Sequence, residues 1–196
     1  HTRLPRRELH THMKKRTLQV VYILCSTYDD EGYPLRFYRG ILPSNTLNCL
    51  RSLTLDVANA GALGPDVDIE VSIYDDTVQP IPVRRIARKL HKRNSELLVG
   101  LVGVQSNQFI RATELAAQFR GLNVPVVVGG FHVSGMLAMF DEITPDLQRL
   151  LDMGVSLFQG EAEAPGALAG LLRDALAGEL KPVYRQTEYP VLTHAG

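Results

Sequence analysis

The residues best suited to ligand binding follow the apolar runs of the chain. Gly129 and Gly130 come directly after the valine-rich run 124–128, and Phe131 and His132 follow them. Two adjacent glycines remove two Cβ atoms and permit positive φ, so a flat or extended ligand can lie against the backbone. A tight turn from a strand into a loop, with no ligand, would use the same pair. The glycine pair therefore indicates a candidate site without identifying its ligand.

Polar residues follow two neighbouring apolar runs. Gln105, Ser106 and Asn107 come after LLVGLVGV, and Gly160 and Glu161 come after VSLFQ. We expect these residues to bind a ligand together with the glycine pair. Ser106 or Asn107 could also cap the next helix, and a carboxylate at Glu161 would suit the positive end of a following helix even without a ligand.

The elements that must position these residues alternate along the chain. Apolar, β-branched runs predict strands, and amphipathic stretches predict helices. Strands are expected at 18–25, 67–75, 97–104, 124–130 and 155–160, helices at 45–62, 83–94, 107–121, 145–152 and 163–178, and a looser region at 131–144. The alternation predicts an α/β fold with a doubly wound, flavodoxin-like (Rossmann-like), five-stranded parallel sheet in the order 2-1-3-4-5, with helices on both faces. Ligands of such sheets bind beyond the carboxyl ends of the strands.

Composition narrows the class of protein. The 196 residues carry 21 basic and 21 acidic side chains, so no net charge favours nucleic acid or an anionic membrane. No apolar run approaches the roughly 20 residues that span a bilayer. The two cysteines, Cys25 and Cys49, suit a reducing cytoplasm, where we expect the protein to be located. Residues 1–12 are interpreted as a vector-derived or disordered extension, 13–180 as the domain, and 181–196 as a linker.

Two common ligand-binding motifs are missing from the sequence, and a third, the phosphate-acceptor pocket of receiver domains, is matched only in part. The first predicted strand is not followed by G-x-G-x-x-G, and the chain has no Walker A motif. The pairs Asp29-Asp30 and Asp75-Asp76 resemble the phosphate-acceptor pockets of receiver domains, but Gln159 and Gly160 stand where a receiver would have a lysine. Adjacent aspartates are usually solvated turn residues. A receiver-like signalling domain and a flavodoxin-like nucleotide-binding domain remain as alternatives.

Taken in order, four stretches resemble a known family. They are Asp75-Asp76, LLVGLVGVQSNQFIRATELAAQFR, VPVVVGGFHVSG and GVSLFQGEAE. The set is similar to the N-terminal cobalamin (vitamin B12)-binding domain of cobalamin-dependent radical S-adenosylmethionine proteins, over about residues 17–185. The carrying motifs are Gly-Gly-x-His at 129–132 and Gly-Glu-x-Glu at 160–163.

The resemblance implies a cofactor-binding module for methyl transfer or a related radical conversion in a longer protein. The cofactor-binding residues it implies are Gln105, Ser106, Asn107, Gly129, Gly130, Phe131, His132, Gly160 and Glu161. Other cobalamin domains place a cobalt-ligating histidine in the loop after the first strand, but residues 26–32 contain none. We therefore expect cobalamin without a histidine ligand from that loop, and a hydrogen-bonding role for His132.

The radical chemistry of the family needs a [4Fe–4S] cluster, which the resemblance places elsewhere. The cluster is held by the three thiolates of a C-x-x-x-C-x-x-C motif, and this chain has two distant cysteines. The cluster and S-adenosylmethionine are therefore expected only in an absent C-terminal radical domain, which would be the partner in cis. The chain alone is predicted to be non-catalytic.

Overall fold

The computed structural model describes residues 15–37, 44–91 and 94–185. The extension expected at 1–12 and most of the linker expected at 181–196 lie outside these ranges. Among the described residues, no helix has both the length and the apolar character needed to cross a membrane.

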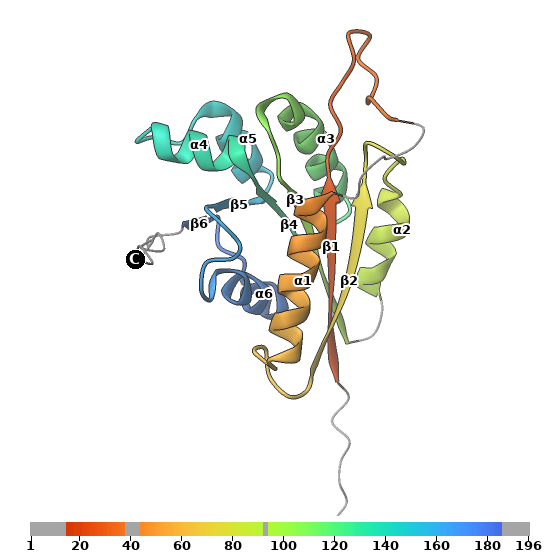
Figure 1. Ribbon diagram of the computed structural model, residues 1–196, viewed down its shortest axis with the longest axis vertical. Coiled ribbons are helices and arrows are strands. Elements are labelled where there is room, and N and C mark those ends of the chain that lie inside the picture. The colour runs from red at the N-terminus through yellow and green to blue at the C-terminus, as the bar shows by residue number, and fades with distance from the viewer. Residues whose placement is uncertain (1–14, 38–43, 92–93, 186–196) are drawn as a thin grey trace, which may run out of the picture.

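A single parallel sheet organises the chain (Figure 1). Its strand order is β2-β1-β3-β4-β5-β6, and every neighbouring pair is parallel. The strands are β1 (Arg16–Leu24), β2 (Val67–Asp75), β3 (Ser95–Val102), β4 (Val126–Gly129), β5 (Ser156–Gln159) and β6 (Val183–Arg185). The parallel α/β architecture is confirmed.

The expected strand count, and with it the full strand order, is wrong. A sixth strand, β6, pairs with β5 beyond the five expected strands, with Val183 opposite Leu157 and Tyr184 opposite Phe158. Part of the stretch interpreted as a linker therefore belongs to the sheet. β6 has only three residues, too few for a period-2 pattern, and it forms because β5 offers an unpaired edge.

Helices cover both faces of the sheet (Figure 1). One face carries α1 (Asn45–Asn59) and α6 (Ala167–Ala177), and the other carries α2 (Val83–Ala87), α3 (Phe109–Arg120), α4 (Phe131–Met139) and α5 (Pro145–Asp152). Two short 3-10 turns, η1 (Arg88–His91) and η2 (Ser106–Gln108), continue α2 and precede α3. The looser region expected at 131–144 is wrong in its first part, because α4 begins directly at Phe131.

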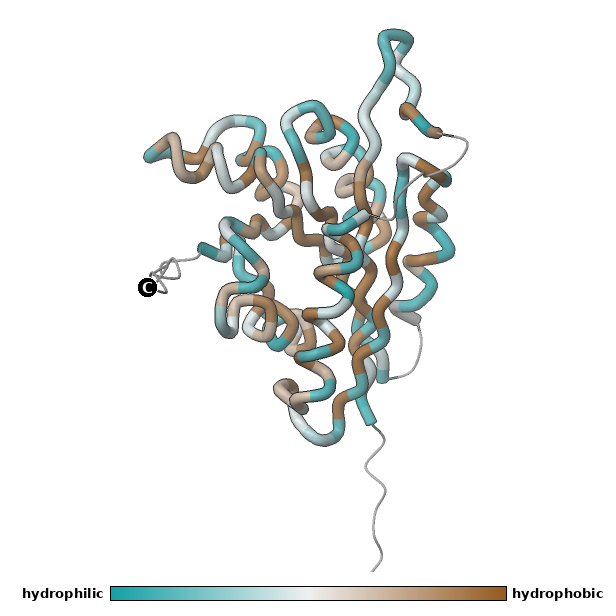
Figure 2. The backbone as a smooth tube through the Cα atoms, in the orientation of Figure 1, coloured by the Kyte–Doolittle hydropathy of each residue, from teal (hydrophilic) through white to brown (hydrophobic). Residues whose placement is uncertain are grey.

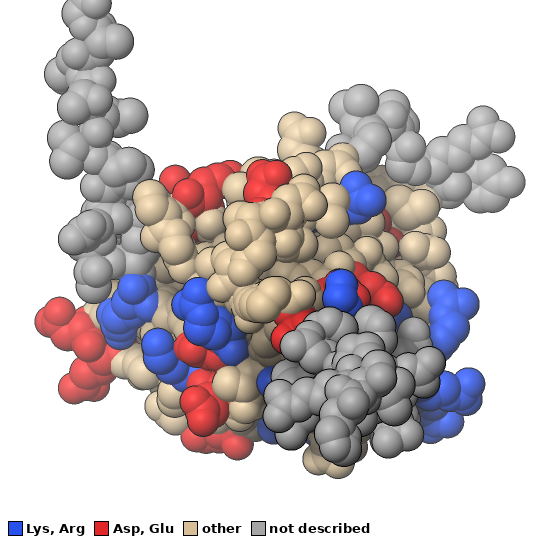
Figure 3. All heavy atoms as spheres, turned by 90° about the horizontal axis from the view of Figure 1, so that it is seen from below, with Lys and Arg blue, Asp and Glu red and all other residues tan. Residues whose placement is uncertain are grey.

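The core forms two layers, one on each side of the sheet. Along β4, Val126 and Val128 face α3 and α5, whereas Val127 faces α1 and α6. Because both faces are covered, the central strands β1, β3 and β4 are mainly continuous apolar runs, whereas the edge strand β2 alternates apolar and polar residues from Val67 to Ile73 (Figure 2). Lys, Arg, Asp and Glu side chains are interspersed on the face shown in Figure 3, which agrees with the zero net charge.

The connection through α6 has the opposite hand to the others. α1 and α6 lie on the same face, yet β1–α1–β2 leads toward one edge of the sheet and β5–α6–β6 leads toward the other (Figure 1). Parallel crossovers are right-handed in about 98% of cases. The unusual crossover returns α6 to the face of α1, and the two helices then stand on either side of the sheet centre.

Candidate functional site

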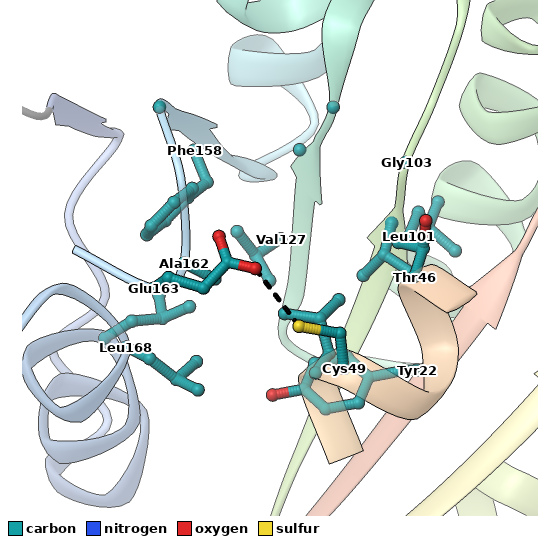
Figure 4. Close-up of a pocket in the computed structure, with 16 residues that line it drawn as sticks. Tyr22, Thr46, Cys49, Leu101, Gly103, Val127, Phe158, Ala162, Glu163 and Leu168 are labelled. Atoms are coloured by element: carbon teal, nitrogen blue, oxygen red, sulfur yellow. Dashed lines mark hydrogen bonds between the residues drawn. The ribbon is translucent and has the colours of Figure 1, made fainter. Parts of the chain in front are cut away.

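A cavity of about 240 Å³ lies between α1 and α6, above the carboxyl ends of β3, β4 and β5 (Figure 4). Strand ends, the starts of both helices and the loop after β5 contribute its walls. The lining residues are Tyr22, Thr46, Cys49, Leu50, Leu101, Val102, Gly103, Val127, Gly129, Gly130, Phe158, Gly160, Ala162, Glu163, Leu168 and Leu171. The position follows from topology, because α1 and α6 lead to opposite edges and leave the sheet centre uncovered.

Glycines form the end of the cavity where the strands finish. Gly129 is in the sheet, and a Cβ there would lie 3.3 Å from Cβ of Phe158. Gly130 has φ +138°, and a Cβ there would lie 2.1 Å from the backbone nitrogen of Val104. Gly130 is therefore required by the fold itself, whereas Gly129 leaves room beside the cavity.

The floor and side walls of the cavity are mainly apolar. Tyr22 presents its ring, and its hydroxyl is bonded to Thr54 Oγ1 at 2.7 Å, away from any ligand. Burial raises the pKa of Tyr22 to about 12, although its hydrogen bond with Thr54 opposes this rise. A Cβ at Gly100 would lie 2.9 Å from the Tyr22 ring, so this glycine allows the ring to lie against β3. The cavity floor thus offers a flat surface without a free hydroxyl.

Helix periodicity places three residues of α1 on one wall of the cavity. Ser44 caps α1 by accepting a hydrogen bond from the Leu47 backbone N–H at 3.3 Å. Thr46, Cys49 and Leu50 are spaced three and four residues apart, so they share the helix face that borders the cavity. Their spacing is also that of an ordinary core-facing helix, so the sequence alone does not indicate that they line a cavity.

One polar pair bridges the mouth of the cavity. The Cys49 thiol donates to Glu163 Oε1, with Sγ and Oε1 3.1 Å apart (Figure 4). The hydrogen bond to this carboxylate and partial burial raise the pKa of Cys49. The thiol is therefore held in its protonated form, and Glu163 contributes a carboxylate to the cavity lining.

The cavity brings together three of the nine residues expected to bind a ligand. Gly129, Gly130 and Gly160 line it. The other six do not line it: Gln105, Ser106, Asn107, Phe131, His132 and Glu161. Phe131 is 79% exposed at the carboxyl edge. The side chain of Gln105 closes a capping box with Gln108 at the start of η2.

His132 turns away from the cavity, toward α3 and α5. Its Nδ1 lies 3.1 Å from Ser106 Oγ, and its Nε2 lies 3.1 Å from Asp146 Oδ2. The ring also packs on Phe109, with ring centroids 4.3 Å apart. Both ring nitrogens therefore have partners within the protein, in keeping with the expected hydrogen-bonding role.

At the β1–β2 side of the same edge, a buried aspartate is surrounded by charge. Asp76 is fully buried, and its carboxylate accepts from Arg111 Nε at 2.7 Å, Arg36 Nη2 at 2.9 Å and Ser26 Oγ at 2.7 Å. Burial by itself would raise the pKa of Asp76, but the hydrogen bonds from Arg111, Ser26 and Arg36 outweigh it and lower the pKa. The interpretation of this aspartate as a solvated turn residue is wrong.

This network extends to the surface and ties down the loop after β1. Arg111 Nη1 donates to Glu114 Oε2 at 2.7 Å, and Glu114 also accepts from the Tyr28 hydroxyl. Asp75 accepts from the backbone and side chain of Thr77. Within the described ranges, His, Cys, Asp and Glu form no group of three that could hold a metal ion.

The cavity suits binding better than bond cleavage. It combines a flat apolar floor, a glycine edge and one thiol–carboxylate pair whose thiol is protonated. The chain matches no protein-family model, and no curated protein is significantly similar to it. The geometry of this site and the motifs that converge on it are therefore the basis for assigning a function.

Proposed function

We propose that this chain is a cobalamin-binding module of the kind found in cobalamin-dependent radical S-adenosylmethionine proteins. The observation that carries the proposal is the cavity between α1 and α6. Two of the motifs behind the sequence resemblance, Gly-Gly-x-His at 129–132 and Gly-Glu-x-Glu at 160–163, contribute Gly129, Gly130, Gly160 and Glu163 to its lining.

The size and chemistry of the cavity fit the nucleotide tail of the cofactor and not its corrin ring. Small-molecule pockets usually enclose about 300–1,000 Å³, so a cavity of about 240 Å³ suits a flat aromatic base. Tyr22, Val127 and Phe158 would contact the faces of such a base, and Gly129 would let it approach the backbone. The Glu163 carboxylate at the mouth would accept a hydrogen bond from a sugar hydroxyl.

The bulky part of the cofactor would lie outside the cavity, over the carboxyl edge of the sheet. α3 and α4 carry exposed apolar side chains. Ile110 is 70% exposed, Phe131 79% and Met139 77%. These side chains would cover one face of a large, mainly apolar macrocycle. Ligand-binding residues expected at this edge, such as Gln105 and Asn107, would contact the macrocycle and not its tail.

When bound, cobalamin supplies a cobalt centre for methyl transfer or a related radical conversion in the longer protein. The residues of this chain bind and orient it. His132 would stay outside the cobalt coordination sphere, since both of its ring nitrogens are already hydrogen-bonded. The expected [4Fe–4S] cluster and S-adenosylmethionine would be bound by a separate radical domain and have no role in the binding proposed for this chain.

The carboxylate of Asp76, which would have to accept a phosphoryl group, disfavours the alternative of a receiver-like signalling domain. Asp76 is fully buried and accepts from Arg36 and Arg111, so it would have to leave two guanidinium groups to accept a phosphoryl group. Losing those ion pairs inside the protein would be costly. The cobalamin proposal needs no such rearrangement.

The proposal is tested by incubating the purified chain with hydroxocobalamin and passing it through a gel-filtration column. We expect cobalamin absorbance to elute with the protein in stoichiometric amount. Flavin mononucleotide, run in parallel, tests the flavodoxin-like alternative and should elute separately. Loss of cobalamin from the protein peak would contradict the proposal, and retention of flavin in its place would favour the alternative.

A further inference from the structure

Three side chains from three separate helical segments form a hydrogen-bonded chain outside the cavity. Ser106 follows β3, His132 lies in the first turn of α4, and Asp146 lies in the first turn of α5. His132 Nδ1 is 3.1 Å from Ser106 Oγ, and His132 Nε2 is 3.1 Å from Asp146 Oδ2. We propose that Ser106 is the nucleophile of an ester-hydrolysing site, with His132 as its general base and Asp146 orienting the imidazole.

The histidine is held by contacts beyond these two hydrogen bonds. Its backbone N–H donates to the Val104 carbonyl at 3.0 Å, which ties the start of α4 to the loop after β3. The ring packs on Phe109, and the side chain is only 12% exposed. A base whose position is fixed in this way needs little reorganisation before it can accept a proton.

The aspartate is equally well anchored. Asp146 Oδ1 accepts from the Thr144 hydroxyl and, at 3.0 Å, from the Leu147 backbone N–H, which leaves Oδ2 for His132. Burial would raise the pKa of Asp146, but the hydrogen bonds from Thr144 and His132 outweigh it and lower the pKa. An ionised Asp146 favours the tautomer with hydrogen on Nε2. Nδ1 then has a lone pair that accepts the Ser106 hydroxyl proton.

Ser106 is exposed, as a nucleophile for an external substrate must be. It begins the three-residue turn η2, which leads directly into α3. Ile110, four residues after Ser106, is 70% exposed, and Phe131, next to His132, is 79% exposed, so an ester with an apolar acyl group is favoured.

The reaction balances with water as the only co-substrate. Ser106 Oγ bonds to the acyl carbon as its proton passes to His132 Nδ1, and that proton leaves with the departing alcohol. Water then attacks the acyl-serine and gives a proton to Nδ1. Collapse of the second intermediate releases the carboxylic acid and returns the proton to Ser106. The net reaction is ester plus water to acid plus alcohol.

The test uses the chain alone and does not depend on cobalamin binding. A fluorophosphonate probe, followed by intact-mass and peptide analysis, should add one label, located at Ser106, and p-nitrophenyl butyrate should be hydrolysed. Ser106→Ala should abolish both signals. Asp146→Asn should slow labelling by at least about 100-fold, because the imidazole loses the carboxylate that fixes its tautomer. Ser52→Ala, at an exposed serine of α1, is the matched control and should react like the original chain.

A second variant covers the case in which fluorophosphonate is too large to enter. Ser106→Cys keeps a nucleophile beside His132, and we expect iodoacetamide to alkylate it faster than Cys49. Circular dichroism verifies that each variant is folded. If neither Ser106 in the original chain nor Cys introduced at position 106 reacts preferentially, or if Ser106→Ala keeps the hydrolysis, the proposal is overturned.

Discussion

The two halves of the sheet's carboxyl edge use space in opposite ways. On the β1–β2 side, Asp76 and Arg111 fill the interior with a buried ion pair. On the β3–β5 side, Gly129 and the apolar walls of α1 and α6 leave a cavity. The comparison indicates that ligand space is kept where strands end in glycine and is lost where they end in paired charges.

The filled half is connected to residues 26–37, the described part of the loop after β1. Arg36 lies on the loop after β1, and its Nε donates to the Asp76 carbonyl at 3.1 Å while its Nη2 pairs with the carboxylate. Tyr28 of the same loop bonds to Glu114 of α3. Residues 26–37 include no histidine, and Tyr28 and Arg36 among them are held by these internal contacts. We interpret the loop as part of the scaffold.

The largest effect is expected from adding a methyl group at Gly130. Gly130→Ala would place Cβ 2.1 Å from the Val104 backbone nitrogen at φ +138°, and neither the backbone nor the alanine can relieve this clash locally. The free energy of unfolding should fall by more than about 4 kcal/mol. Urea denaturation followed by circular dichroism measures it.

Gly129→Ala is the matched control one residue earlier. Its Cβ would lie 3.3 Å from Cβ of Phe158, a tight contact that a small shift relieves, so we expect a loss of about 1 kcal/mol. Similar losses at both positions would show that the structure misplaces the contact between Gly130 and the loop after β3.

The next largest effect is expected in the filled half. Asp76→Asn removes the charge that pairs with Arg111 and Arg36, and an unpaired buried charge costs about 3 kcal/mol of unfolding free energy. Asp68→Asn removes an exposed pair with Lys15 and should cost less than about 1 kcal/mol. Equal costs would remove the distinction drawn between the two halves, because Asp76 would then behave as a surface residue.

The stability effect of Asp76→Asn should also depend on pH. The folded-state pKa of Asp76 is lowered, so its contribution to stability is fully present above the unfolded carboxyl pKa of about 4. That contribution is lost as the pH falls through the folded-state value. The stability difference between the original chain and Asp76→Asn should therefore be constant from pH 5 to neutrality and shrink at lower pH. A difference that grows on acidification would contradict the assigned ion pairs.

The two cysteines offer a smaller and chemically direct comparison. Cys25 lies in the filled half, fully buried, and burial raises its pKa to about 12, with the Asp76 charge adding to the rise. Cys49 borders the cavity. Iodoacetamide should modify Cys49 in the folded chain at least about 100-fold faster than Cys25, as measured by peptide mass spectrometry.

Glu163→Gln sharpens this comparison and gives the smallest effect. Removing the carboxylate lowers the pKa of Cys49, so its alkylation should be a few times faster while that of Cys25 is unchanged. An unchanged rate at Cys49 would mean that the thiol does not donate to Glu163 in solution.

Much of the fold was predictable because strands and helices of this class have clear patterns. The valine-rich run before Gly129 indicated a strand, and Val126 and Val128 of that run are fully buried in β4. β6 could not be predicted, since three residues carry no periodicity and depend on pairing with β5. α4 was missed because FHVSGMLAM is apolar on nearly all sides and has no amphipathic pattern.

Of the candidate site, only the glycines at the strand ends were predictable from the sequence. Glycines at strand ends have a steric signature in the sequence, so Gly129, Gly130 and Gly160 were found. The direction of a polar side chain after a strand depends on its tertiary partners. His132 was expected to face the ligand, but it faces Asp146 for this reason. The walls of the cavity depend on the hand of the α6 crossover, which no local pattern reveals.

The central claim is that the cavity between α1 and α6 binds cobalamin, and a cavity-filling variant tests it most directly. Val127 lies on the cavity floor and is 5% exposed, so Val127→Phe would extend into the cavity (Figure 4). Val78→Phe adds the same bulk at a 40% exposed position and is the matched control. Equilibrium dialysis with hydroxocobalamin should show stoichiometric binding by the original chain and Val78→Phe, and binding at least about tenfold weaker by folded Val127→Phe. Equal binding by all three proteins, or by none, would contradict the claim.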